Sequence, residues 1–354
     1  MTDSTHATDP AANGDPLPHA PDGHPAIRQG RTGVLLIALG TPDAPTVPAV
    51  RRYLREFLGD PRVVELPRAL WLPILYGPIL TFRPRKSAAA YARIWDHERD
   101  ESPLRTVTRD QADGLAGRLG DDVMVDWAFT YGTPSIDERL RAMRQAGCDR
   151  LLLFPLYPHY SATTTAAALD RVFLSLRHMR WQPAIRTMPA FHDDPVYIDA
   201  LARSVRAELD GLDWTPDRII ASYHSIPKDY WDKGDPYPCQ CKKTSRLLRE
   251  ALGWSPDNFL TTYQSRVGPK EWVSPYTDKA AEQLGAEGVK KIAVLAPAFT
   301  GDCLETLEEL NMELRETFAE AGGTHFHYIP CLNASEPGLD VLDHTVRREL
   351  QGWV

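Results

Sequence analysis

The sequence contains no run of 18 apolar residues, which excludes a helix long enough to span a membrane. Cysteine is scarce: the five present are odd in number and scattered, which suits a reducing cytoplasm better than a disulfide framework. No long lysine or arginine run occurs and the formal net charge is -8, so nucleic acid is not an expected partner. We therefore expect a cytoplasmic protein.

Two further features are missing. No Gly-x-Gly-x-x-Gly or phosphate loop follows a predicted strand, which disfavours a dinucleotide-binding protein. Residues 1–30 hold five prolines and little to bury, so we predict a disordered, Pro-rich tail there. This tail lacks the apolar stretch of a secretory signal and is too acidic for a mitochondrial transit peptide.

Beyond the tail, short β-rich runs alternate with amphipathic stretches, a pattern typical of βαβ units and parallel sheets. The predicted strands are Val34–Leu39, Val123–Phe129, Leu151–Pro155, Ile185–Met188, Arg218–Tyr223, Phe259–Tyr263, Lys291–Ala296 and His325–Ile329. The predicted helices include Val47–Leu58, Leu104–Leu119, Ser135–Gln145, Ala162–Arg177, Val196–Leu209 and Tyr276–Leu284. We predict an α/β fold with two similar, doubly wound (Rossmann-like) halves, residues 31–182 and 183–354, hinged near Trp181–Phe191 with the active-site cleft between them.

The most informative segment is Ile219–Tyr237, IIASYHSIPKDYWDKGDPY. Its apolar strand is predicted to carry His224 to the carboxyl end, outside which open parallel sheets bind their ligands. An imidazole in that position is a candidate base or metal ligand. The position alone leaves open the alternative that His224 is only structural.

A second candidate site follows the strand Lys291–Ala296, where carboxylates recur at spacings of three, four and four residues. They are Asp302, Glu305, Glu309 and Glu313. The spacing predicts one face of an α-helix, with Leu307, Leu310, Leu314 and Phe318 on the opposite face. A solvated acidic face would explain the row. However, stacked like charges repel one another, and a ladder of carboxylates suits a path for a divalent metal and for displaced protons.

The most apolar segment is Leu66–Phe82, LPRALWLPILYGPILTF. Its prolines, Pro67, Pro73 and Pro78, are expected to break any long helix there. Core packing is one interpretation of this segment. Closely spaced prolines and aromatic residues fit the apolar mouth of a ligand site better.

The Ile219–Tyr237 segment resembles the signature of the ferrochelatases, in which His-Ser, an aliphatic residue and Pro are followed by a spacer that ends in Gly-Asp-Pro-Tyr. Other blocks are similar to the same family: Leu39-Gly40-Thr41-Pro42, Arg51-Arg52-Tyr53-Leu54, Asp60-Pro61-Arg62-Val63, Leu156-Tyr157-Pro158, Gln264-Ser265-Arg266-Val267-Gly268-Pro269 and Leu304-Glu305-Thr306-Leu307. The resemblance covers roughly residues 33–340 and is to the bacterial type without an iron–sulfur cluster.

The resemblance implies a lyase that inserts Fe²⁺ into protoporphyrin IX and releases two protons, the last step of haem synthesis. His224 matches the family's proton acceptor and Glu305 its facing glutamate, and the two would share metal binding. Asp302, Glu309 and Glu313 would continue as a relay for protons or metal. The expected porphyrin-binding residues are Tyr91, Tyr131, Trp272, Arg83, Leu72 and Leu75.

The expected partners are therefore protoporphyrin IX and ferrous iron, both as substrates, with no permanently bound cofactor. We expect no iron–sulfur cluster, because the chain ends RRELQGWV and Ala162 stands at the usual early cysteine position. Two residues depart from the family pattern: Cys303 stands where animal relatives have histidine, and Thr130 where relatives usually have arginine. A monomer is favoured, and the apolar mouth could touch the inner membrane surface.

Two alternatives stay open. Insertion of iron into coproporphyrin III would change only the substrate rim, and the apolar Leu66–Phe82 segment favours a substrate with vinyl groups. A non-catalytic haem or metal carrier on the same fold would need a pocket. Such a carrier would not need a base paired with an acidic relay, so the presence of His224 and Glu305 argues against it.

Overall fold

The structure, a computed structural model, describes residues 21–22, 24 and 27–354, and these form two four-stranded parallel sheets. Most of the tail predicted for residues 1–30 lies outside the described residues. The first sheet has the order β2-β1-β3-β4 and the second β6-β5-β7-β8. The strands are β1 (Arg31–Gly40), β2 (Val123–Tyr131), β3 (Cys148–Pro155), β4 (Ala184–Thr187), β5 (Arg218–His224), β6 (Phe259–Gln264), β7 (Lys291–Leu295) and β8 (His325–Tyr328).

The prediction of two similar α/β halves is confirmed, because both sheets place their second strand at one edge, followed by the first, third and fourth. A loop contact repeats as well. The Phe129 N–H donates to the Pro134 carbonyl after β2, and the Tyr263 N–H to the Pro275 carbonyl after β6, both at 2.8 Å. Every predicted strand corresponds to an observed one, since buried parallel strands form short apolar runs that are easily recognised.

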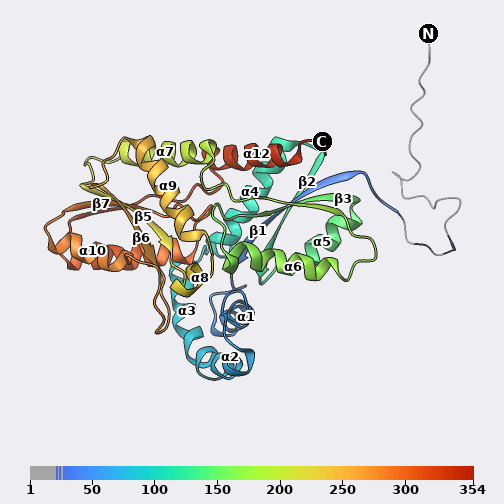
Figure 1. Cartoon of the computed structure of the whole chain (residues 1–354), viewed down its shortest axis with the longest axis horizontal. Helices are drawn as coiled ribbons and strands as arrows, with labels where there is room; N and C mark the ends of the chain where they lie inside the picture. The colour runs from blue at the N-terminus through green and yellow to red at the C-terminus, as the bar shows by residue number, and fades with distance from the viewer. Residues whose placement is uncertain (1–20, 23, 25–26) are drawn as a thin grey trace, which may run out of the picture.

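Helices cover both faces of each sheet, as a doubly wound fold requires (Figure 1). The first half contains α1 (Val47–Leu58), α4 (Pro103–Leu119), α5 (Ile136–Gln145) and α6 (Ala167–Leu176), which follows a short π-helix, η3 (Ala162–Ala166); of these, α4, α5 and α6 pack on the sheet. The second half contains α8 (Lys228–Asp232), α9 (Tyr237–Leu252), α10 (Thr277–Ala286), the π-helix η4 (Glu305–Glu313) and α11 (Leu314–Glu320).

The last helix of each half crosses to the other half. Helix α7 (Pro195–Asp210), which follows β4, packs on α9, and α12 (Glu336–Leu350), which follows β8, packs on α4 and β3. The two crossing helices also pack on each other along one side of the molecule (Figure 1). Strand β4 pairs with β3, so the first sheet extends to Thr187. The boundary between the two halves at residue 182 stays a prediction.

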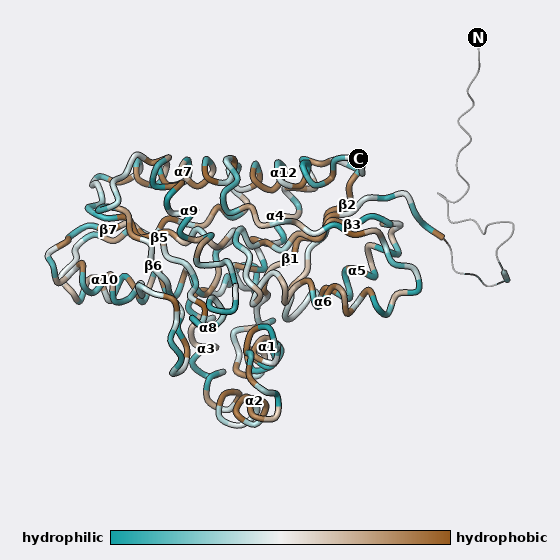
Figure 2. Tube along the Cα trace, viewed as in Figure 1, coloured by the Kyte–Doolittle hydropathy of each residue, from teal (hydrophilic) through white to brown (hydrophobic). Residues whose placement is uncertain are grey.

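Three helical segments, α2 (Arg68–Ile74), the π-helix η2 (Leu75–Ile79) and α3 (Leu80–Ile94), run on continuously. Together with α1, which packs on α3, they form a unit that protrudes on the side opposite α7 and α12 (Figure 1). The expectation that prolines break a long helix here is confirmed in part: η2 interrupts the α-helix between α2 and α3, but the helical backbone does not end. Proline lacks an N–H donor and so interrupts the hydrogen bonds of an α-helix. The wider turn of η2, which contains Pro78, accommodates this interruption. Brown, hydrophobic stretches mark α2 in Figure 2. Among the described helices, none is long and apolar enough to cross a membrane.

Gly40 joins this protruding unit to the first sheet through a backbone that only glycine tolerates. Its φ is +111°, and an added Cβ would lie 1.8 Å from the Tyr131 carbonyl oxygen. Gly120 has φ +72° but open space around the same position. We predict that Gly120→Ala destabilises the fold by about 1–2 kcal/mol through backbone strain alone. Gly40→Ala should lower the free energy of unfolding by about 3 kcal/mol or more, because a steric clash adds to the backbone strain. Urea unfolding of both variants measures the difference, and equal losses would contradict the clash.

Candidate active site

His224 is the last residue of β5 and lies at the carboxyl end of the second sheet, as predicted. The side chain is half-buried, and its Nδ1 lies 2.6 Å from the Ser225 carbonyl oxygen. A carbonyl oxygen only accepts hydrogen bonds, so Nδ1 carries the hydrogen of the neutral ring. The other nitrogen, Nε2, is therefore the basic atom that can accept a proton.

The loops that follow β5 and β6 are joined edge to edge, and this brings Trp272 beside the segment after His224. Pro227 and Trp272 form an antiparallel bridge, and the Lys228 N–H donates to the Glu271 carbonyl at 2.9 Å. The half-buried Trp272 indole donates in turn to the Val267 carbonyl at 3.0 Å. The structure thus places Trp272, a predicted porphyrin-binding residue, beside the segment that follows His224.

The acidic row adopts a π-helix, η4, rather than the predicted α-helix. Its i→i+5 hydrogen bonds widen the turn, and such segments occur often at functional sites. The apolar face is as expected: Leu310, Leu314 and Phe318 are buried against the second sheet. Local spacing alone could not show the wider turn, because tertiary partners hold it.

Asp302 does not continue the acidic row, contrary to the sequence prediction. It precedes the helix and is buried, and its Oδ1 accepts from the Tyr328 hydroxyl at 2.7 Å and the Thr306 hydroxyl at 2.9 Å. The other oxygen, Oδ2, accepts from the Asn333 amide at 2.7 Å. With both oxygens held by neighbouring side chains, Asp302 anchors the start of the helix.

Glu309 is half-buried and is held by several hydrogen bonds from the end of β6. Its carboxylate accepts from the Ser265 N–H at 2.8 Å, from Gln264 Nε2 at 3.2 Å, and from the Ser265 hydroxyl. Burial raises the pKa of Glu309, and the nearby Glu305 carboxylate raises it further. The Ser265 bond, the charge of His224 and the Gln264 bond act in the opposite direction. His224 and Glu305 therefore each lie within electrostatic range of Glu309.

Glu305 faces the protruding unit. Burial raises the pKa of Tyr53 and of Tyr91, and the Glu305 carboxylate raises each further. Burial lowers the pKa of Arg83, and Glu305 is the largest influence that opposes this shift. The structure thus brings the predicted Tyr91 and Arg83 toward the glutamate. Sequence reasoning assigned no role to Tyr53, although it lies in a block that resembles the family.

Tyr131 is fully buried at the end of β2, and its neighbours explain the unusual Thr130. The Thr130 hydroxyl donates to the Ala38 carbonyl at 3.2 Å. Arg171 of α6 instead supplies a guanidinium here, 5.4 Å from the centre of the Tyr131 ring and 3.6 Å from a carboxylate oxygen of Asp60. The sequence carried no signal for this cation, since it comes from a different helix.

The two leucines predicted as porphyrin walls differ in exposure. Leu75 is fully buried among Tyr53, Leu54 and Trp71, so it belongs to the core of the protruding unit, while Leu72 is half-buried. A side chain without accessible surface cannot line a substrate wall in this conformation. The apolar side chains that do reach the surface of this unit are Leu70, Ile74, Tyr76 and Phe82.

Two ion pairs tie α3 to η4, and sequence reasoning missed both. Arg93 pairs with the buried Glu308 and lies 3.7 Å from the exposed Glu313. The i, i+4 spacing that drew attention to Glu309 and Glu313 passes over Glu308. Only the packing of α3 against η4 reveals its partner.

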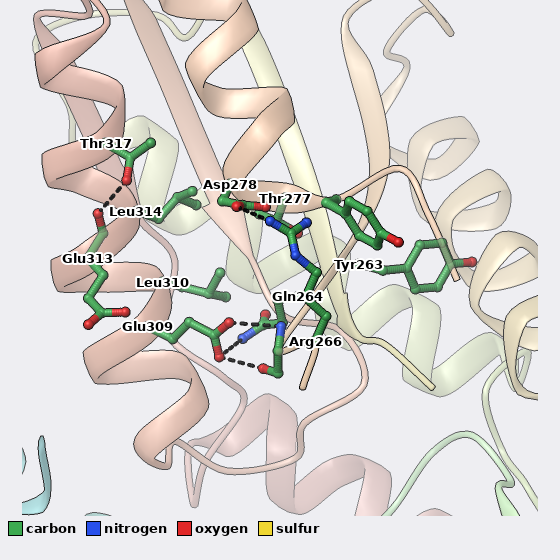
Figure 3. Close-up of a pocket in the computed structure, with 12 residues that line it drawn as sticks. Tyr263, Gln264, Arg266, Thr277, Asp278, Glu309, Leu310, Glu313, Leu314 and Thr317 are labelled. Atoms are coloured by element: carbon green, nitrogen blue, oxygen red, sulfur yellow. Dashed lines mark hydrogen bonds and ion pairs between the residues drawn. The ribbon is translucent and has the colours of Figure 1, made fainter. Parts of the chain in front are cut away.

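A polar cavity of about 370 Å³ opens beside η4 (Figure 3). Glu309 and Glu313 line one wall, and Arg266, paired with Asp278 at 2.7 Å, lines the other. Glu309 thus reaches both this cavity and the charges of His224 and Glu305. Among the described residues, no three His, Cys, Asp or Glu side chains are grouped closely enough to hold a metal ion by themselves.

Comparison with known structures shows the fold. Sirohydrochlorin chelatase SirB from Bacillus subtilis subspecies spizizenii, solved in complex with cobalt, superimposes with a TM-score of 0.51 over 91% of this chain and 96% of its own. Only 11% of the residues are identical, so this likeness concerns architecture alone.

Sequence comparison is far closer. A ferrochelatase from Rhizobium etli (strain CIAT 652) is 57% identical over 336 residues, which cover 94% of this chain and 98% of that relative. A ferrochelatase from Rhizobium meliloti (strain 1021) is 56% identical over 333 residues, with the same coverage. The family model for ferrochelatase matches residues 31–350. The chain, which carries His224 at the carboxyl end of β5 and Glu305 at the start of η4, therefore belongs to the ferrochelatase family.

Proposed function

We propose that the protein inserts Fe²⁺ into protoporphyrin IX to give protohaem and two protons, with His224 and Glu305 as the reacting pair. The observation that carries this proposal is the arrangement around Glu309, which lies within electrostatic range of both residues. A carrier would need no such pairing of a base with half-buried carboxylates.

The chemistry requires two pyrrole N–H protons to leave as the metal enters. The Nε2 atom of His224 suits the first acceptor, because an imidazole nitrogen with a free lone pair is a common general base. Glu305 would face it across the macrocycle, and an imidazole with a carboxylate is a ligand pair that suits Fe²⁺ as the incoming substrate. Tyr91, Arg83 and Trp272 would contact the porphyrin, with Arg83 available to a propionate group.

Glu309 would take the proton onward. A protonated His224 favours the ionised form of Glu309, so each proton accepted at the histidine prepares the next acceptor. The polar cavity that Glu309 and Glu313 line offers an exit toward solvent (Figure 3). We infer that Asp302 is not part of this path, since both of its oxygens are already bonded.

The exposed apolar side chains of the protruding unit support peripheral contact with the inner membrane surface by a cytoplasmic protein. Phe82 is 73% exposed, and Leu70 and Tyr76 are each 57% exposed. Exposed cationic residues flank them in the sequence and would attract anionic lipids: Arg68 on one side and Arg85 and Lys86 on the other. An apolar product could leave the site directly into such a surface.

The assay that tests the function is anaerobic mixing of the protein with Fe²⁺ and protoporphyrin IX, or with coproporphyrin III, followed by absorbance. We predict that His224→Ala lowers the rate of metal insertion by about 10²–10⁴, the usual loss for a general base. Porphyrin binding, followed by fluorescence, should stay close to wild type. Turnover within threefold of wild type would remove His224 from the mechanism.

The acidic residues should differ in importance along η4. We expect Glu305→Gln to lower kcat by about 10² or more, because it faces the reacting centre. Glu313→Gln should lower kcat by less than about fivefold, since Glu313 is exposed and lies next to Arg93. Steady-state kinetics of both variants checks the order, and a larger loss for Glu313→Gln would reverse the proposed direction of proton flow.

Exposed and buried apolar residues of the protruding unit should respond differently to an introduced charge. The double variant Tyr76→Asp, Phe82→Asp should keep its thermal stability but lose binding to vesicles that contain anionic lipid, measured by co-sedimentation. Leu75→Asp, the buried control, should unfold instead, because it places a charge in an apolar core. Unchanged vesicle binding of the double variant would place the membrane contact elsewhere or exclude it.

A further inference from the structure

Ser265 has an unusual backbone conformation that turns it toward Glu309. It follows β6 with φ +67°, one of three non-glycine residues at positive φ in the described part of the chain. Such a conformation is unfavourable for a residue with a Cβ and persists where the surroundings enforce it. Here it allows the Ser265 N–H and hydroxyl to donate to the same carboxylate.

Gln264 acts from the same strand end, and its amide is held on both sides. The Ser222 hydroxyl donates to Gln264 Oε1 at 2.8 Å, so Nε2 points to the helix. There it donates to the Glu305 carbonyl at 2.8 Å and to Glu309 at 3.2 Å. A buried chain of hydroxyls, Ser222, Thr277 and Thr262, with successive contacts of 2.8 Å, supports this orientation.

The groups that donate hydrogen bonds to Glu309 are uncharged, whereas the nearby acidic residues pair with arginines. Arg93 pairs with Glu308 and approaches Glu313, while Arg266, beside Ser265, pairs with Asp278. Glu309 is therefore fixed in place by hydrogen bonds that do not neutralise its charge. That is the arrangement expected of a carboxylate that must hold a set position and still accept a proton.

We propose that Gln264 and Ser265 are positioning residues for metal insertion, which hold the Glu309 carboxylate between the His224–Glu305 pair and the polar cavity. Gln264 also donates to the Glu305 carbonyl at the first turn of η4 and so ties that turn to the same strand end. This inference rests on the proposed function of Glu309 as the next proton acceptor.

Ser265→Gly provides the test, because it removes the hydroxyl donor and keeps the backbone N–H. Glycine also tolerates positive φ, so thermal stability should be equal to or above that of wild type. We expect kcat for anaerobic Fe²⁺ insertion to fall about tenfold, with both KM values unchanged, since only a fixed position is lost. Asp100→Gly is the matched control: Asp100 has φ +49°, is exposed, and should keep full activity.

A double-mutant cycle with Glu309→Gln shows whether Ser265 acts through Glu309. If it does, adding Ser265→Gly to Glu309→Gln should lower kcat no further. Independent, multiplicative losses would overturn the positioning role and leave the relay intact. Near-normal kcat of Glu309→Gln alone would instead overturn the relay itself. A Ser265→Gly variant of low stability, with kcat restored at lower temperature, would show a role in folding and overturn the inference.

Discussion

The arrangement of the site depends on one apolar core that both sheets share. Inward-facing side chains of β1 and β3 join those of β5 and β7 beneath the crossing helices α7 and α12. Its fully buried members include Val34, Leu36, Leu152, Phe154, Ile219, Ala221 and Ala293. Each large aliphatic side chain contributes about 1.5–3 kcal/mol on burial, so this cluster fixes the second sheet relative to the first.

The π-helix η4 is held by partners from three other elements. Tyr328 of β8 bonds to Asp302 before the first turn, Gln264 of β6 bonds to the Glu305 carbonyl, and Arg93 of α3 pairs with Glu308. Isolated π-helices are rare, because their wide turn is less favourable than an α-helix. Contacts from both halves thus place the carboxylates, and the site depends on the relative position of the halves.

Much of this architecture was predictable from the sequence. The strands were found because buried parallel strands form short apolar runs, and His224 was found because such a run ends at it. The acidic row was found by its spacing, which correctly separated the apolar face from the carboxylates. Asp302 was misjudged, because spacing does not reveal that a side chain is already bonded to Tyr328 and Asn333.

The sequence by itself determined the α/β class, the positions of the strands and the catalytic candidates, since these depend on local patterns of apolar residues and on short motifs. The tertiary structure alone decided that Leu75 is core, that Arg171 supplies the cation beside Tyr131, and that Ser265 bonds to Glu309. These contacts join residues far apart in the chain. Their geometry follows from how the sheets and helices pack, which no local pattern encodes.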